Sequence, residues 1–118
     1  MNLRKIDVSS NNITNEGIEF IAENNRIINL EILDLRNNII GTKGFVELIK
    51  SPRFSNLLDL RVDMNKIDDA KQITYNCQLD KLRKFSVRDN QFGSKGCFYI
   101  QVFALRNLIE INLSKNDI

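Results

Sequence analysis

The side chains that most often carry out chemistry in proteins are scarce in this sequence. Its 118 residues include no histidine and only two cysteines, Cys77 and Cys97. Without histidine there is no Ser-His or Cys-His nucleophile pair, and the usual zinc sites are excluded. The stretch GTKG, Gly41 to Gly44, lacks the spacing of a phosphate-binding loop. We therefore expect no enzyme, no catalytic residue, no metal site and no cofactor.

The cysteines and the densest basic cluster each have two interpretations. Cys97 occupies an apolar position with helical spacing, which favours a small buried side chain over a reactive thiol. Cys77 falls in an irregular segment where its thiol can be exposed, but it has no basic neighbour to activate it. Lys81, Arg83 and Lys84 favour a solvated edge over a phosphate site, because no aromatic side chain accompanies them.

The composition is ordinary for one globular domain. Apolar residues make up 42% and charged residues 27%, and the net charge is +2. So small a charge argues against nucleic acid or an acidic membrane as the partner. No apolar run approaches the roughly 20 residues of a membrane span, and the first residues show no signal-peptide pattern. This favours the cytoplasm, although a translocated bacterial effector would have the same kind of repeat sequence.

An internal repeat organises the chain. One copy reads Leu30-x-x-Leu33-x-Leu35-x-x-Asn38-x-Ile40, and the pattern occurs four more times. The five copies start at residues 3, 30, 57, 82 and 108. Their asparagines, which recur every 25–27 residues, are Asn11, Asn38, Asn65, Asn90 and Asn116. Five copies with no failure at the asparagine indicate a stack of similar units.

Each part of the pattern has a physical reason. Two central apolar residues separated by one residue, such as Leu33 and Leu35, have the period of a short strand with one buried face. The turn that follows bends the chain inside the structure, where backbone groups lose water. An asparagine side chain carries donors and an acceptor for those groups, whereas leucine has neither and aspartate lacks the donor. We therefore expect a ladder of hydrogen-bonded asparagines through the stack.

The rest of each copy predicts a helix. Three glycines lie six residues after their asparagines and precede apolar residues at helical spacing; they are Gly17, Gly44 and Gly96. The apolar set after the last of them is Cys97, Ile100 and Phe103. The third copy is two residues shorter and has Lys71 in place of the glycine. There we expect a helix over 69–76 with Ile73 facing inward.

With strand, asparagine turn and helix in one long period, the sequence from Leu3 to Ile118 resembles leucine-rich repeat proteins of the ribonuclease-inhibitor-like subclass. The resemblance implies an α/β fold, a right-handed solenoid or horseshoe arc with parallel strands on the concave face and helices on the convex face. It also implies a single domain over residues 1–118 with about four and a half repeats. Members of this family inhibit ribonuclease, cap actin filaments, activate Ran-type GTPases, sense pathogens or act as bacterial effectors. What they share is the binding of another protein.

Residues between the apolar positions of such strands point to the concave face, in rows about 4.8 Å apart. One row alternates in charge through Arg36, Asp63 and Arg88, with Asp34 and Arg61 in the next. Three apolar residues at or beside the face, Ile32, Leu58 and Met64, can form a small patch ringed by charge. The expected partner-binding residues are Asp34, Arg36, Arg61, Asp63, Arg88, Ile32 and Leu58. Either these charges orient a partner, or they neutralise one another and keep an exposed sheet soluble, each pair contributing about 0–1 kcal/mol.

The sequence is thus in accord with three functions. The leading one is a non-enzymatic module that binds another protein on the concave face. The alternatives are a regulator of a partner enzyme, such as a small GTPase, and a structural protein that self-associates through its uncapped ends. No cap sequence covers either end of the array, so we also expect either a longer array or other chains that cover the ends.

Overall fold

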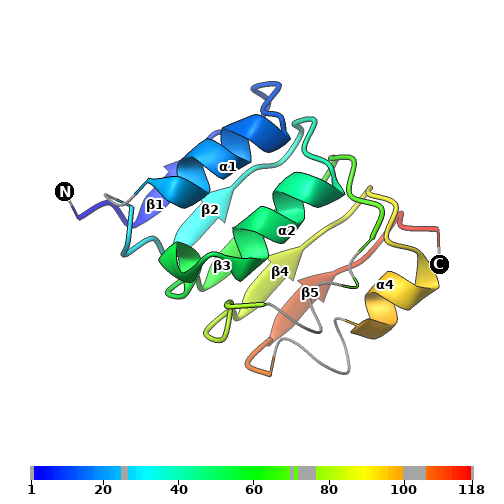
Figure 1. Ribbon diagram of the computed structural model, residues 1–118. Helices are drawn as coiled ribbons and strands as arrows, with labels where there is room; N and C mark the ends of the chain where they lie inside the picture. Colours follow the sequence, from blue (N-terminus) through cyan, green and yellow to red (C-terminus); the bar gives the residue numbers. More distant parts are fainter. Residues whose placement is uncertain (1, 25–26, 70, 72–76, 100–105, 118) are drawn as a thin grey trace.

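The computed structural model describes residues 2–24, 27–69, 71, 77–99 and 106–117. Each sequence repeat contributes one three-residue strand, and the five strands form one parallel sheet in chain order (Figure 1). The strands are β1 (Lys5–Asp7), β2 (Ile32–Asp34), β3 (Asp59–Arg61), β4 (Lys84–Ser86) and β5 (Glu110–Asn112). Their register aligns the first central apolar residue of every copy, in the order Ile6, Leu33, Leu60, Phe85 and Ile111. The repeat spacing therefore predicts the register as it is observed.

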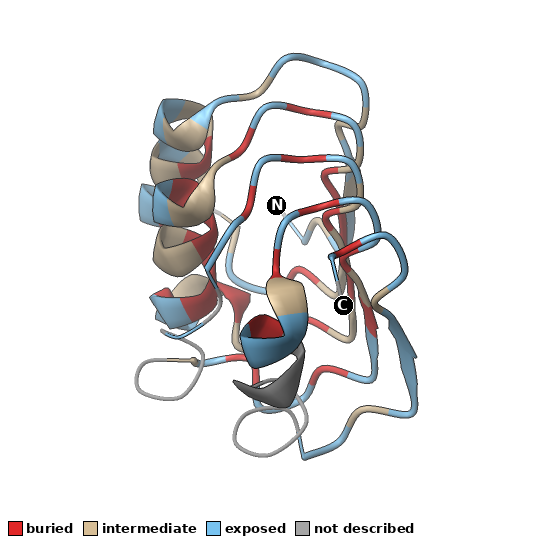
Figure 2. Cartoon of the chain, turned by 90° about the vertical axis from the view of Figure 1, so that its right-hand side faces the viewer, coloured by how far each residue is buried: buried red, intermediate tan, exposed pale blue. Residues whose placement is uncertain are grey.

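The helices lie together on one side of this sheet. They are α1 (Asn15–Glu23), α2 (Thr42–Lys50) and α4 (Gly93–Tyr99), with a 3₁₀ turn, η1 (Pro52–Phe54), after α2. Figure 2 shows the helices and the sheet as two separate layers, joined by the turns of successive coils. The expected α/β solenoid, with parallel strands on the concave face and helices on the convex face, is confirmed.

The core fills the space between the two layers with the apolar residues of the repeat. Leu33, Leu60 and Phe85 point inward from neighbouring strands and are at most 2% exposed. From the helix layer, Phe45 of α2 stacks on Phe85 at a centroid distance of 6.3 Å, and it meets the edge of Phe92 at 5.7 Å. These contacts tie α2, β4 and the turn after β4 together, because aromatic side chains bury large areas.

One glycine of the helical segments is required by a close approach between coils. A β-carbon at Gly44 would lie 2.6 Å from the Oδ1 atom and 3.0 Å from the Cα atom of Asn15. Asn15 begins α1, and its Oδ1 atom accepts the backbone N–H groups of Gly41 at 2.7 Å and Gly44 at 3.0 Å. The first helix therefore caps the start of the second, and only glycine leaves room for this contact.

Some expectations fall outside the described residues. Of the helix expected over 69–76, residues 70 and 72–76 are not described, and Ile73 is among them. The same holds for Ile100 and Phe103 and for the side chain of Cys97.

Candidate protein-binding face

From the second repeat on, the asparagine of each repeat lies at the end of its strand segment and its side chain bonds to two coils. Asn65 is 8% exposed. Its Nδ2 group donates to the carbonyl oxygens of Val62 and Asp63 in its own coil, and to that of Leu35 in the preceding coil at 3.0 Å. Its Oδ1 atom accepts the backbone N–H of Ile40 at 3.0 Å. One side chain thus satisfies four backbone groups and joins two coils.

The other asparagines of the set repeat this geometry. Asn38, Asn90 and Asn116 are buried, and each donates to carbonyls of its own and the preceding coil. Asn11, in the first described coil, is exposed and donates only to Val8 and Ser9 of its own coil. These bonds fix the spacing of the coils, so the side chains between them are held in rigid rows.

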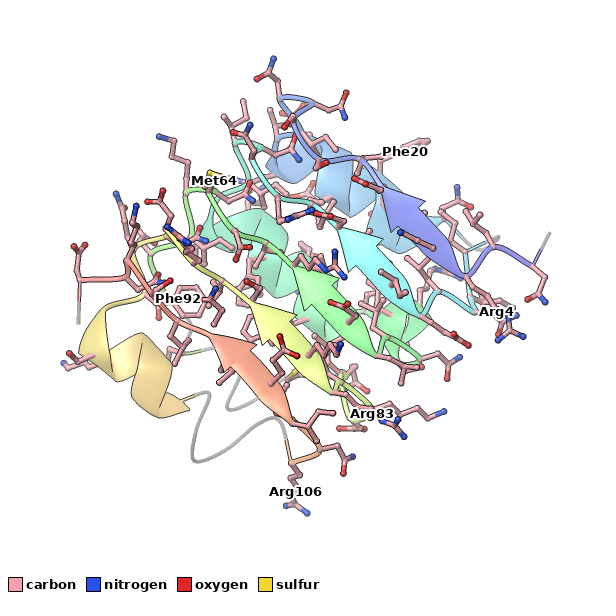
Figure 3. The ribbon with its side chains drawn as sticks, turned by 180° about the vertical axis from the view of Figure 1, so that it is seen from behind. Arg4, Phe20, Met64, Arg83, Phe92 and Arg106 are labelled. Carbon is pink, nitrogen blue, oxygen red and sulfur yellow. The ribbon has the colours of Figure 1, made fainter. Side chains whose placement is uncertain are left out.

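The residue before each asparagine adopts a left-handed backbone conformation with φ between 54° and 58°. These residues are Ser10, Asn37, Met64, Asp89 and Lys115. Met64 therefore lies in the turn, 47% exposed, at the edge where the strands end. Figure 3 places it across the sheet from Arg83, which lies where the strands begin.

This geometry corrects the expected apolar patch. Leu58 directly precedes β3, whereas Met64 follows the same strand by three residues, so the strand lies between them. Ile32 lies in β2, half-buried, and aligns with Asp59 of β3. Ile32 and Leu58 thus lie near the edge where the strands begin, whereas Met64 lies at the opposite edge and is not part of a patch with them.

Asp34 is the buried centre of the charged face. Its side chain is only 3% exposed. It accepts the Nε group of Arg36 at 2.9 Å and the Nη2 group at 2.7 Å. The Nη1 group of Arg61 approaches it from the next strand at 3.8 Å. Asp34 is covered by these two guanidinium groups, so it anchors them and is itself buried beneath the charged face.

The charges pair mainly along each strand. Arg61 donates to both carboxylate oxygens of Asp59, at 3.2 and 2.8 Å, in the same way as Arg36 holds Asp34. Hydrogen bonding to Asp34 raises the pKa of Arg36, and hydrogen bonding to Asp59 raises that of Arg61. Both guanidinium groups are therefore held in one orientation, and both stay protonated.

The row expected through Arg36, Asp63 and Arg88 forms only in part. Asp63 accepts the backbone N–H of Arg88 at 2.7 Å and the hydroxyl of Ser86. Within the described residues, no ion pair involves the side chain of Arg88, which is exposed. Asp63 thus bonds to β4 and the turn after it, while the guanidinium group of Arg88 remains accessible.

An open trough of about 310 Å³ lies on the strand face. Of the expected partner-binding residues, Arg36, Arg61 and Asp63 line it, whereas Arg88 and Asp34 do not. Lys84 and Glu110 also line it, with their charged atoms 3.8 Å apart, and neither is among the expected partner-binding residues. The repeat could have indicated both, because they occupy the same repeat position as Ile32, which is among them.

Family models described as leucine-rich repeats match this chain twice, at residues 1–22 and at residues 29–51. The matched segments correspond to the first coil and the second, and the strand register and asparagine geometry continue through the later coils. These matches show leucine-rich repeats in the first two coils. A comparison with curated proteins found no match.

The described residues hold few other groups that could carry out chemistry. Cys77 is a free cysteine that packs against the core, and burial raises the pKa of its thiol, which corrects the expectation of an exposed side chain. In the described residues no three or more acidic, histidine or cysteine side chains gather into a metal site. Across the same residues, no helix has the length and apolar character needed to span a membrane. Leucine-rich repeat proteins are generally not enzymes, and their repeats are commonly modules for protein–protein interaction.

Proposed function

We propose that this leucine-rich repeat protein is a non-enzymatic module that binds another protein on its concave strand face. The observation that carries the proposal is the trough of about 310 Å³, in which guanidinium groups are held in place by carboxylates of the same strands. Side chains that are already oriented lose little conformational freedom when a partner binds. A rigid charged surface of this kind favours specific recognition over general adhesion.

The charged residues of this face have two roles in the proposal. Arg36 and Arg61 maintain the surface, because each holds a carboxylate and both cover buried Asp34. Lys84 and Arg88 contact the partner, because both are exposed and neither neutralises a buried group. Positive and negative groups alternate in the trough, so the partner surface carries both signs in a matching arrangement.

The proposal also covers the subclass and the location. Repeats of 25–27 residues, of which the first, second and fourth combine a short strand with a described helix, favour the ribonuclease-inhibitor-like subclass. Cys77 is a free thiol. A cytoplasmic location, where thiols are kept reduced, is in accord with this.

A capture experiment with a matched control tests the binding face. The test variant is Lys84→Glu with Arg88→Glu on the concave side. The control is Lys43→Glu with Lys50→Glu on α2, where both lysines are exposed and make exposed ion pairs. Both variants change the net charge by the same amount, and both should remain folded because they alter only exposed side chains.

We expect wild type and the α2 control to retain the same partner from a cell lysate, and the concave variant to lose it. The partner is identified by mass spectrometry, and circular dichroism checks that all three proteins are folded. Equal capture by all three proteins, or no capture by any of them, would contradict binding on the concave face.

Self-association is a second candidate, favoured by the last described strand. Ile111 occupies the core position of β5 that Phe85 fills in β4, yet it is 41% exposed. A second copy stacked on β5 would cover this side chain. The capture experiment identifies this case directly, because the retained partner would then be an untagged copy of the chain.

A further inference from the structure

A second surface lies apart from the trough, at the edge where β3, β4 and β5 begin. It is an open groove of about 480 Å³ lined by Leu58, Lys81, Arg83, Asn107 and Ile109. Each of these residues precedes its strand, and none of them lines the trough on the concave face. Figure 3 shows Arg83 at this edge, with Arg106 on the same side. The groove therefore needs an explanation separate from the proposed binding face.

Backbone hydrogen bonds hold the central residues of the groove in a fixed order. The N–H of Arg83 donates to the carbonyl of Leu58 at 2.9 Å, and the N–H of Ile109 donates to the carbonyl of Arg83 at 2.8 Å. Leu58, Arg83 and Ile109 thus occupy equivalent positions in successive coils, with Arg83 in the middle. Neighbouring coils are spaced by about 4.8 Å. The apolar side chains flank the guanidinium group on both sides.

The apolar part of the groove is unusually accessible. Ile109 is 76% exposed, the largest value among the exposed large apolar side chains of the described residues. Leu58 is half-buried and forms the other apolar wall. Such side chains favour contact with a partner that removes them from water, at about 25 cal/mol per Å² of apolar surface buried.

The charge of the groove is positive. Lys81 and Arg83 line it, and no acidic residue does. Lys81 is held in place by the Oδ1 atom of Asn56 at 2.8 Å, and Asn107 by the carbonyl of Asp80 at 2.7 Å. No ion pair of the described residues involves Lys81 or Arg83. Their charges are available to a partner, and a guanidinium group favours a carboxylate with two parallel hydrogen bonds.

We infer that this groove binds a peptide segment of a partner protein in which an acidic residue is flanked by aliphatic or aromatic side chains. The carboxylate bonds to Arg83, with Lys81 beside it, and the flanking apolar side chains pack on Leu58 and Ile109. The order apolar, acidic, apolar follows from the order of the three residues in the groove. The apolar walls favour a peptide over a nucleic acid, because no aromatic side chain lines the groove for stacking with bases.

Selection from a random-peptide phage library on the immobilised wild-type chain tests this inference. The groove variant is Arg83→Glu with Ile109→Ser. The matched control is Lys66→Glu with Phe20→Ser, since Lys66 is exposed away from the groove and Phe20 on α1 is 73% exposed. Enriched peptides are synthesised, and fluorescence anisotropy measures their dissociation constants for these three proteins and for the concave variant, Lys84→Glu with Arg88→Glu.

We expect enriched peptides with aspartate or glutamate between apolar residues, which bind the groove variant at least about tenfold more weakly and the control unchanged. No enrichment, enrichment of sequences without a carboxylate, or equal binding by the groove variant would overturn the inference. Peptides that lose affinity only for Lys84→Glu with Arg88→Glu belong to the concave face and would also overturn it. So would a single-stranded oligouridylate that binds at this edge while no peptide does.

Discussion

Asn65→Ala is expected to lower the free energy of unfolding by about 2–4 kcal/mol. The substitution removes the acceptor of the buried N–H of Ile40, which bonds to the Oδ1 atom of Asn65 at 3.0 Å. A buried donor left without a partner costs about 1–3 kcal/mol. The lost bonds to the carbonyls and the small void left behind add to this cost.

The loss of stability is limited, because two of the carbonyl groups that Asn65 bonds also accept from a second asparagine. The carbonyl of Leu35 also accepts from Asn38, and that of Val62 also accepts from Asn90. Each keeps one donor when Asn65 is replaced. The expected loss is therefore smaller than four orphaned groups would give, and it falls mainly on the contact between the second and third coils.

Urea unfolding followed by circular dichroism measures this effect. Asn29→Ala is the matched control, because Asn29 is exposed and its bond to Asn2 is long, at 3.4 Å. We expect the control to change stability by less than about 0.5 kcal/mol. Equal unfolding midpoints for the two variants would show that the ladder does not hold the coils together.

Arg36→Glu is expected to destabilise the protein by about 3–5 kcal/mol. It removes the guanidinium group that covers Asp34 and brings a second carboxylate toward a side chain that is only 3% exposed. Arg61 remains 3.8 Å from Asp34 but keeps its closer bonds to Asp59. A buried carboxylate that loses its main partner is costly because the protein interior solvates charge poorly.

Arg88→Glu provides the contrast, since it reverses the same charge on the same face. Arg88 is exposed and neutralises no buried group in the described residues, so we expect a change within about 0.5 kcal/mol. In an Asp34→Asn background, Arg36→Glu should cost less than about 1 kcal/mol, because the buried charge is gone. Denaturant melts of wild type, Arg36→Glu, Arg88→Glu, Asp34→Asn and the double variant check this. Equal costs for Arg36→Glu in both backgrounds would show that the buried charge of Asp34 does not cause the destabilisation.

The two arginine variants bear on how the binding face is tested. A variant that reverses Arg36 and Arg61 would lose its partner whether or not those residues touch it, because the surface itself is disturbed. Lys84 and Arg88 avoid this difficulty. Their substitution reports on contact with the partner rather than on folding.

The fold was predictable because the repeat maps directly onto it. A fixed spacing between Leu33 and Leu60 becomes strand register when coils stack, so one-dimensional periodicity determines which residues align. The asparagine position was predictable for a similar reason, since a buried turn requires a side chain with both donors and an acceptor. Neither deduction needs knowledge of side-chain rotamers.

The details of the face depend on rotamers and on the path of the backbone, which spacing does not determine. Asp34 is buried because the side chain of Arg36 folds back along its own strand, while the sequence suggested pairing across strands. Met64 lies in a left-handed turn, so it is at the edge and not in a patch with Ile32. Glycine is required at position 44 because Asn15 of the preceding coil lies too close for a β-carbon. This contact exists only when the two coils are stacked, so the sequence alone does not reveal it.

Binding on the concave face is tested most directly by photo-crosslinking from single positions on either side of the molecule. A photoreactive amino acid replaces Lys84 in the trough or Lys43 on α2, both of which are exposed. We predict that the captured partner is crosslinked from position 84 and not from position 43. A crosslink from position 43 alone, or equal crosslinking from both positions, would contradict binding on the concave face.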